Sequence, residues 1–318
     1  MMTQRGHSVV TYAPSGSEVE GELVETHDPR GVNEDYKTKF FDIEWDANGP
    51  DFAPANAAVI EALRDRVEPY DLICVIGGVC QQPIAQAFPN NFVVEHGIGY
   101  RGVFANYKVF ESYAWKHWVY GSIQNDNVKF YDTVIPNYFD LKDFPAGGGR
   151  GDYFLFVGRL IDRKGWRIAV DATERLGAKL IMAGQTGGEL PELPDHVTHV
   201  GHVNAKERAE LMGNALATFV PTTYIEPFGG VAVESMLCGT PVVATDAGAF
   251  VETVVPGVTG FRANLLSEFV QAAVAATSLN RETVRNVAVS RYSLNAVAPL
   301  YENYFDRLST LYGEGWYS

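Results

Sequence analysis

The stretch Tyr153-Phe-Leu-Phe-Val-Gly158-Arg159-Leu-Ile-Asp-Arg-Lys164-Gly165 decides the fold of the second half of this 318-residue chain. Its first five residues are apolar or aromatic and the run stops at a glycine, which is typical of a buried strand. Residues 166–176 then repeat apolar side chains at helical spacing, so we expect a strand at 153–158 followed by a helix. A strand that leads into a helix is the repeating unit of a parallel sheet with crossover helices.

The same alternation continues on both sides of this stretch. Strands are predicted at 7–13, 70–76, 91–95, 128–135, 179–183, 197–200, 217–221 and 241–244, and helices at 56–67, 106–120, 205–214, 230–238 and 294–312. Between the two halves, Phe144-Pro-Ala-Gly-Gly-Gly-Arg-Gly-Asp152 has three successive glycines after a proline, which favours a linker. The sequence therefore predicts an α/β chain with two Rossmann-like, doubly wound domains, at 1–146 and 150–293, and a C-terminal helical segment at 294–318.

Two such domains joined by a short linker would face each other across a cleft lined by the carboxyl edges of their sheets. Helix N-termini point toward those edges, where their free N–H groups and positive dipole ends favour an anionic ligand. The architecture thus favours a phosphate-bearing small molecule, although a fold alone selects no reaction.

Composition narrows the class of protein. The formal charge is −14, from 25 basic and 39 acidic residues, which argues against a partner made of nucleic acid or anionic lipid. The three cysteines, Cys74, Cys80 and Cys238, have no metal-like spacing and indicate a reducing compartment. The chain starts MMTQRGHSVV, without the pattern of a signal peptide, and no run reaches the roughly 18 apolar residues of a membrane span. We therefore expect a cytoplasmic, soluble protein with no integral membrane segment.

Two cations follow the strand at 153–158. Arg159 and Lys164 lie between its terminal glycine and the next predicted helix. A planar guanidinium and an ammonium at the carboxyl end of a strand suit the charge of a diphosphate. The alternative is a solvated basic loop, which the flanking Gly158 and Gly165 and the preceding buried strand disfavour.

A second motif, Glu226-Pro-Phe228-Gly229-Gly230-Val231-Ala-Val-Glu234, combines two carboxylates, two glycines and the start of a predicted helix. The glycines let backbone N–H groups approach a ligand closely, and phosphate oxygens would gain hydrogen bonds there. Glu234 lies among apolar neighbours and needs a partner, for which a ribose diol is suitable. Glu226 could hold hydroxyls of a transferred sugar. Either glutamate alone could instead be an N-cap or a surface acid.

A third segment, Glu95-His96-Gly97-Ile-Gly99-Tyr-Arg-Gly102, follows the strand predicted at 91–95. The donor capacity and near-neutral titration of a histidine suit the positioning of a reacting sugar, although a loop histidine can also merely cap backbone groups. The glycines spell the G-x-G-x-x-G pattern of dinucleotide binding, but no acid stands at the end of the next predicted strand, which argues against a nicotinamide or flavin site.

Two patterns are absent from the sequence. It contains no Asp-x-Asp pair, the usual clamp for a divalent metal on a diphosphate, so protein cations would have to stabilise the leaving group. It also has no recognisable grouping for a covalent nucleophile. We expect neither a metal nor a cofactor.

With these motifs assembled, the region from about Val134 to Phe261 resembles the retaining glycosyltransferases of family 4, which have the GT-B fold. The resemblance is carried by VIPN at the domain crossing, FVGRL followed by KG, EPFGGVAVES, GTPVVATDAGAFVET and GVTGF, in that order. It implies transfer of a sugar from a nucleoside diphosphate with retention of anomeric configuration and without metal. It also implies that the C-terminal tail, with Trp316 and Tyr317, returns to the N-terminal domain.

The resemblance also implies roles for individual residues. Arg159 and Lys164 would hold the donor diphosphate, and Glu226 would contact the sugar hydroxyls. The backbone of residues 228–231 would lie near the sugar and phosphate, Glu234 would bind the ribose, and His96 would lie near the transferred sugar. These enzymes are described as using front-face displacement, in which the departing phosphate helps deprotonate the acceptor, so no protein base is assigned.

The N-terminus departs from the family pattern. RGHSVV is similar to the end of the family's first helix and its second strand, so the usual first strand and glycine-rich loop would be missing. Either residues 7–13 take the central place of that strand, or the acceptor domain is shortened. The resemblance as a whole implies a hexosyltransferase that uses a UDP- or GDP-hexose as co-substrate. The alternative is a shortened, catalytically weak nucleotide-sugar-binding protein.

Overall fold

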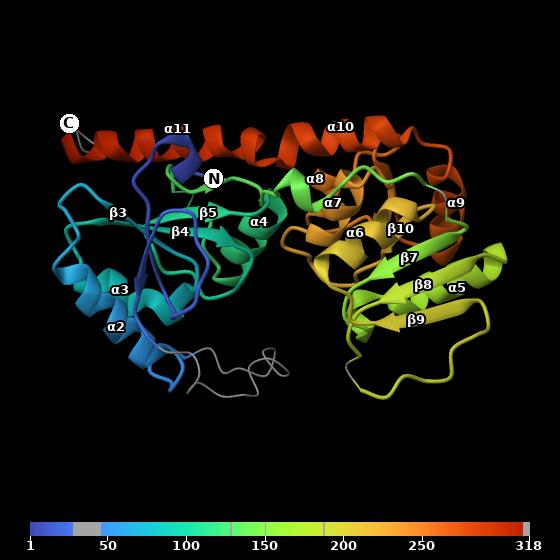
Figure 1. Ribbon diagram of the computed structural model, residues 1–318, viewed down its shortest axis with the longest axis horizontal. Helices are drawn as coiled ribbons and strands as arrows, with labels where there is room; N and C mark the ends of the chain where they lie inside the picture. The colour runs from blue at the N-terminus through green and yellow to red at the C-terminus, as the bar shows by residue number, and fades with distance from the viewer. Residues whose placement is uncertain (28–45, 128, 150, 187, 314–318) are drawn as a thin grey trace. The chain divides into compact units, whose positions relative to one another are not determined.

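The computed structural model describes residues 1–27, 46–127, 129–149, 151–186 and 188–313 (Figure 1). Contacts divide the chain into two compact units. Unit 1 comprises 1–110, 127–133 and 300–318, and unit 2 comprises 111–126 and 134–299. Both units contain parallel strands connected through helices, so the predicted α/β class is confirmed.

Unit 2 contains a six-stranded parallel sheet in the order β12-β11-β10-β7-β8-β9. The strands are β7 (Tyr153–Val157), β8 (Lys179–Ala183), β9 (Val197–Gly201), β10 (Thr218–Val220), β11 (Val242–Thr245) and β12 (Gly260–Ala263). From β7 the chain proceeds to β8 and β9 on one side and then to β10, β11 and β12 on the other. The strand order therefore reverses between β7 and β10, and ligands of open α/β sheets bind outside the carboxyl ends of strands at such a point.

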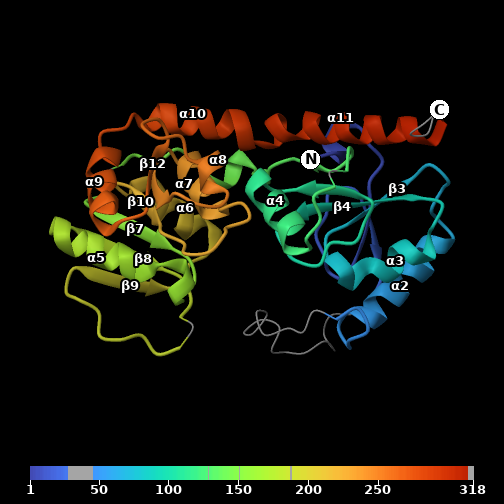
Figure 2. The ribbon, with the colours of Figure 1, turned by 180° about the vertical axis from the view of Figure 1, so that it is seen from behind.

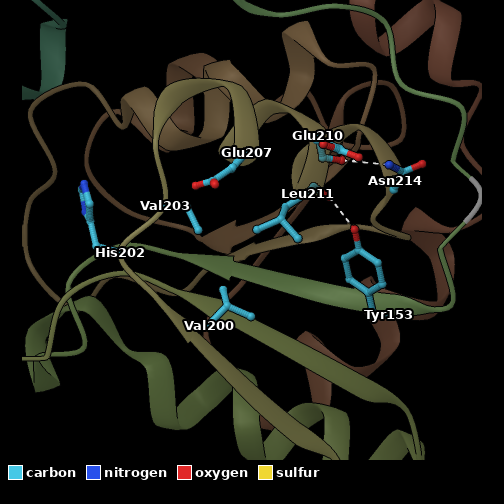
Figure 3. Close-up of a pocket in the computed structure, with 8 residues that line it drawn as sticks. All are labelled: Tyr153, Val200, His202, Val203, Glu207, Glu210, Leu211 and Asn214. Carbon is cyan, nitrogen blue, oxygen red and sulfur yellow. Dashed lines mark hydrogen bonds between the residues drawn. The ribbon is translucent and has the colours of Figure 1, made fainter.

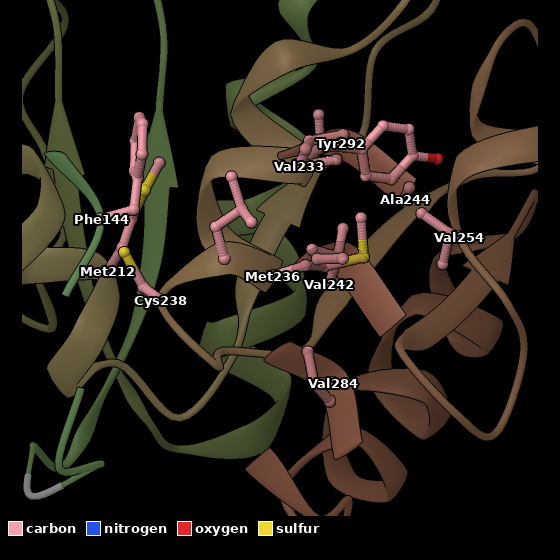
Figure 4. Packing of buried hydrophobic residues seen from close by; sticks show 14 of the residues in the cluster. Phe144, Met212, Val233, Met236, Cys238, Val242, Ala244, Val254, Val284 and Tyr292 are labelled. Atoms are coloured by element: carbon pink, nitrogen blue, oxygen red, sulfur yellow. The ribbon is translucent and has the colours of Figure 1, made fainter. Parts of the chain in front are cut away.

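Helices cover both faces of this sheet. They are α5 (Trp166–Leu176), α6 (Ala205–Asn214), α7 (Gly230–Leu237), α8 (Phe250–Thr253), α9 (Leu266–Ala276) and α10 (Arg281–Tyr292). Side chains of β7 alternate between two cores: Leu155 packs with α6, α7 and α10, whereas Phe154 and Phe156 pack with α5 and α9. Figure 4 shows part of the first core, with Met212, Met236 and Val284 from three helices, and Figure 2 shows α5 on the other face of β7 and β8. The buried sheet holds the loops after its strands in fixed positions.

Unit 1 has a four-stranded sheet in the order β3-β4-β5-β6. Its elements are β3 (Leu72–Val75), β4 (Phe92–Ile98), β5 (Tyr107–Phe110), β6 (Thr133–Val134), α2 (Phe52–Arg64) and α3 (Gln82–Ala87). The strands β1 (Val10–Ala13) and β2 (Glu22–Glu25) form a separate parallel pair. Residues 7–13 therefore do not occupy the central place in the larger sheet that one sequence alternative gave them.

The helix predicted at 106–120 was wrong in its first part. Residues Tyr107–Phe110 form β5, and the helix α4 covers Tyr113–Ser122. Lys108, Val109 and Phe110 are buried in the sheet, and the side chain of Ser112 accepts a hydrogen bond from the N–H of Trp115 at the start of α4. Burial on both faces of a strand masks the alternation by which a sequence reveals it, and the N-cap serine then marks the true start of the helix.

The helix α11 (Leu294–Gly313) ends the described chain. Its residues from 300 onward belong to unit 1, where the hydroxyl of Tyr304 donates to the carbonyl oxygen of Tyr131 at 3.0 Å and the guanidinium of Arg5 binds the carboxylate of Glu302 at 2.7 Å. Residues 316 and 317 lie outside the described residues. No helix within the described ranges is both long and apolar enough to cross a bilayer.

Candidate functional site

The loops that follow β7 and β10 meet at the reversal point of the unit 2 sheet. The backbone N–H of Thr223 donates to the carbonyl oxygen of Arg163 at 2.9 Å and so ties the two loops together. Gly165, the N-cap residue before α5, has φ +72°, and a Cβ at this position would lie 1.9 Å from the carbonyl oxygen of Pro221. The close packing of the two loops fixes the backbone on both sides of Lys164.

Lys164 and Glu226, which are 62 residues apart in the sequence, form an ion pair across these loops. The distance from Lys164 Nζ to Glu226 Oε2 is 2.9 Å, and the side chains are only 22% and 13% exposed. The ring of Tyr224 lies 3.9 Å from the guanidinium carbon of Arg163 and 5.0 Å from Lys164 Nζ. Two of the predicted donor-site residues therefore touch each other, on a surface that carries both a cation and a carboxylate.

Arg159 lies near Tyr224, beside the Lys164–Glu226 ion pair. Burial, the charge of Glu226 and a hydrogen bond to its carboxylate raise the pKa of Tyr224, while the nearby guanidinium groups of Arg163 and Arg159 lower it. Arg159 lies two residues after the end of β7 and is half-buried. Cations from the loop after β7 thus lie around a tyrosine that is hydrogen-bonded to the predicted sugar-binding carboxylate.

The helix α7 begins at Gly230, four residues after Glu226. Gly229 has φ +78°, and a Cβ there would lie 2.4 Å from the ring of Phe250. A Cβ on Gly230 would meet nothing within 4 Å, so its backbone borders open space. Among the described residues, no acceptor is recorded for the N–H groups of Gly230 and Val231, as expected for the first turn of a helix. The first turn of α7 can therefore receive an anionic group.

Phe228 contributes differently from its glycine neighbours. Its side chain is 3% exposed and contacts the rings of Phe139 and Tyr292 in the core. The side chain of Phe228 is therefore part of the core, and only its backbone could contact a ligand.

Glu234, on α7, has a partner that the sequence did not reveal. Arg208 of α6 approaches it with a distance of 2.8 Å from Nε to Oε2, and the side chains are 28% and 16% exposed. Burial raises the pKa of Glu234, and the charge of Arg208 opposes that rise. No sequence pattern links the two residues, because they become neighbours only through the packing of α6 on α7.

Glu111 and Ser112 are two further residues of this region that the sequence analysis missed. The hydroxyl of Ser112 donates to the carbonyl oxygen of Pro227 at 2.5 Å, and Glu111 Oε1 accepts a hydrogen bond from the amide of Asn137 at 2.9 Å. Burial raises the pKa of Glu111 to about 7, the hydrogen bond from Asn137 opposes the rise, and the charge of Glu226 adds to it. These residues remained hidden because 106–120 was predicted as one helix. The serine before α4 was the available signal.

Replacement of Glu111 by Gln is expected to change how stability depends on pH. The native carboxyl holds its proton up to about pH 7, whereas an unfolded glutamate loses it near pH 4.3. The wild-type protein should therefore lose, between about pH 4.5 and 7, on the order of 3 kcal/mol of unfolding free energy that Glu111→Gln does not lose. Denaturant titrations of both proteins at pH 4.5, 6 and 8 measure this difference. A constant difference across the series would contradict the burial of Glu111.

His96 lies in unit 1, within β4 rather than on the loop after it, so the loop assignment was wrong. Strand pairing with β5 extends to Ile98, because the ladder resumes beyond an irregularity between Glu95 and Ile98. The imidazole makes an edge contact with the ring of Tyr301, 6.2 Å between centroids, and burial lowers its pKa to about 4. At neutral pH His96 is therefore uncharged, and it can act as a hydrogen-bonding group but not as a cation.

The loop that follows β4 folds around the carboxylate of Glu95. Glu95 is fully buried and accepts hydrogen bonds from the hydroxyl of Tyr100 and from the N–H groups of Phe104 and Ala105, at 3.0 to 3.1 Å. The G-x-G-x-x-G pattern here begins inside β4, at Gly97, and continues into the loop before β5, which is folded around the buried carboxylate of Glu95. This local structure accounts for the segment without a dinucleotide.

A separate cavity of about 460 Å³ lies between α6 and the sheet of unit 2 (Figure 3). Its lining comprises Tyr153, Val200, His202, Val203, Glu207, Glu210, Leu211 and Asn214. The hydroxyl of Tyr153 donates to the carbonyl oxygen of Leu211 at 2.9 Å across it. None of the residues predicted for the donor site lines this cavity, so it is distinct from the Lys164–Glu226 cluster.

Known proteins resemble this chain most clearly in unit 2. Residues 148–265 match the family model of glycosyl transferases group 1. The phosphatidyl-myo-inositol mannosyltransferase of Mycobacterium tuberculosis is 29% identical over 211 residues, which cover 58% of this chain and 54% of that protein. The chain thus spans about half the length of this curated relative.

Solved structures extend the likeness to nearly the whole fold. AviGT4, a glycosyltransferase involved in avilamycin A biosynthesis, superposes with a TM-score of 0.73 at 21% identity, covering 97% of this chain and 87% of its own. HepE of Anabaena, solved in complex with UDP-glucose, gives a TM-score of 0.65 at 21% identity and covers 91% of this chain and 86% of its own. Residues 148–265 therefore carry a glycosyl transferases group 1 domain, in a chain that has the GT-B fold of two Rossmann-like domains.

Proposed function

We propose that this protein transfers a hexose-type sugar from UDP or GDP to an acceptor, with retention of anomeric configuration and without a metal ion. The observation that carries the proposal is the Lys164–Glu226 pair beside the open N-terminus of α7, at the reversal point of the sheet. This arrangement offers a cation and backbone N–H groups to a diphosphate and a carboxylate to sugar hydroxyls. The mannosyltransferase relative and the structure of HepE with UDP-glucose support a nucleotide-sugar donor.

In the proposed reaction the bond between the anomeric carbon and the diphosphate oxygen breaks, and the acceptor oxygen bonds to the same face of that carbon. The proton of the acceptor hydroxyl passes to the departing phosphate. Lys164 and Arg159 would neutralise the charge that develops on the diphosphate, and Glu226 would orient the sugar. His96 would contribute a neutral hydrogen bond near the transferred sugar, and no protein group is assigned as a base.

A screen of thermal stability against UDP, GDP and their common hexose derivatives, followed by assays of transfer and donor hydrolysis, tests the proposal. We expect a rise in melting temperature with one nucleotide series and turnover of its sugar. Nucleotide binding without any turnover would favour the alternative of a catalytically weak binding protein. If no nucleotide binds at all, the proposed function is wrong.

Replacement of Glu234 by Ala is expected to weaken nucleotide binding about 10- to 100-fold. In the donor complex its carboxylate would accept a hydrogen bond from the ribose, and one bond to a charged acceptor contributes about 1.5–3 kcal/mol. The loss should appear in the dissociation constant of free UDP or GDP, measured by calorimetry. Glu268→Ala is the matched control, because Glu268 caps the exposed start of α9. Unchanged nucleotide affinity in Glu234→Ala would show that Glu234 does not bind the ribose.

A further inference from the structure

Glu111 lies beside the predicted sugar-binding carboxylate. It directly precedes Ser112, whose hydroxyl donates to the carbonyl oxygen of Pro227, and Pro227 directly follows Glu226. Both segments belong to unit 2. A hydrogen bond between the two segments thus holds residues 111–112 beside 226–227. In addition to burial, the negative charge of Glu226 raises the pKa of Glu111.

The two carboxyl groups have different partners. Glu226 is paired with the ammonium of Lys164 at 2.9 Å. Glu111 is bound through Oε1 to the neutral amide of Asn137, and no ion pair of Glu111 is recorded within the described ranges. The carboxylate can accept hydrogen bonds from sugar hydroxyls, and the remaining N–H of the Asn137 amide can donate one to them. No cation among the described residues forms an ion pair that would neutralise the ionised Glu111 carboxylate.

Positive and negative side chains therefore occupy different parts of the site. The cations Arg159, Arg163 and Lys164 come from the loop after β7, where a diphosphate would lie. Above about pH 7, where it is mostly ionised, Glu111 adds a second negative group next to Glu226, where the sugar would lie. A carboxylate carried by the sugar would face this group, and like charges in a partly desolvated site repel each other.

We propose that Glu111 is a specificity-determining residue of the donor site, which accepts a hydroxyl of the transferred sugar beside Glu226 and excludes sugars that carry a carboxylate. This inference rests on the proposed function and deepens it, because it names neutral hexoses as the donor class and uronic acids as the excluded class. The bond from Asn137 orients the Glu111 carboxyl for this contact.

Affinities of the full chain for two donor pairs test the inference: UDP-glucose against UDP-glucuronate, and GDP-mannose against GDP-mannuronate. At pH 8, where Glu111 is mostly ionised, the wild-type protein should bind the neutral member of its preferred pair about 10-fold more tightly or better. Glu111→Gln keeps the shape and the acceptor for Asn137 but removes the charge, and it should reduce this preference about 3- to 10-fold. Its affinity for the free nucleotide should stay unchanged, which also shows that the variant is folded.

Two further variants separate charge from structure. Glu111→Asp keeps the charge and should keep most of the preference for the neutral sugar. Glu252→Gln is the control for the position of α4, because the Glu252 carboxylate accepts hydrogen bonds from the N–H groups of Tyr113 and Ala114. It should leave the preference as in the wild type.

Three results would overturn the inference alone: equal wild-type affinity for the two members of the preferred pair, an unchanged preference in Glu111→Gln, or the same change in Glu252→Gln. If the wild-type protein binds neither UDP nor GDP, the proposed function fails and this inference fails with it. The free-nucleotide measurement therefore distinguishes the two failures.

Discussion

Lys164→Ala is expected to lower the turnover number about 10²–10³-fold, the range seen when a group that stabilises developing charge is removed. The diphosphate gains negative charge as its bond to the sugar breaks, and Lys164 is held at the end of the β7 loop to meet it. The same change leaves Glu226 without its cation at a position where it is only 13% exposed. A buried, uncompensated carboxylate would disturb the sugar contact as well. The turnover of donor hydrolysis or transfer, at saturating nucleotide sugar, measures the effect.

Lys179→Ala is the matched control for this prediction. Its ammonium pairs with Asp152 at 2.5 Å on the same domain, but the side chain is 67% exposed. Exposed ion pairs contribute little to stability, and the total charge changes by the same amount as in Lys164→Ala. We expect a nearly normal rate for this variant. A nearly normal rate for Lys164→Ala, or an equal loss in both, would show that Lys164 does not stabilise the leaving group.

Gly165→Ala is expected to lower the free energy of unfolding by about 3–5 kcal/mol, a size typical of backbone strain combined with overpacking. The φ of +72° alone costs an alanine about 1–2 kcal/mol. In addition, the new Cβ would lie 1.9 Å from the carbonyl oxygen of Pro221, which belongs to the backbone of the β10 loop and cannot rotate away. The two loops would have to separate, so activity should fall together with stability. Chemical denaturation followed by circular dichroism measures the change.

Gly177→Ala provides the comparison, at the other end of the same helix. Gly177 has φ +61°, and a Cβ there would meet nothing within 4 Å. We expect the free energy of unfolding to fall by only about 1–2 kcal/mol and activity to stay unchanged, because backbone strain is not accompanied by a steric clash. Similar losses for the two variants would mean that the contact between Gly165 and Pro221 does not hold the loops together.

Much of unit 2 could be predicted because its elements carry local signals. The helices α5 and α6 have the predicted bounds, since their apolar periodicity is clear and their ends coincide with Gly165, Gly177 and the capping box of Asn204. The helices α8, α9 and α10 and the strand β12 were missed. The segment at 266–276 is rich in alanine and valine, and its apolar pattern is compatible with more than one secondary structure. The strand at 260–263 is short and starts at a glycine, so its identity depends on pairing with β11.

The sequence by itself determined the fold class, the glycine turns at Gly158 and Gly165 and the chemical groups at the strand ends, because hydrophobic periodicity and turn chemistry act between residues close in the chain. Only the tertiary structure decided which groups meet. The strand order brought Lys164 to Glu226, the packing of α6 on α7 gave Glu234 its partner Arg208, and the capping of α4 placed Glu111 beside Glu226. These contacts depend on how whole elements pack against each other, and that packing is set by the summed burial of many side chains rather than by any local pattern.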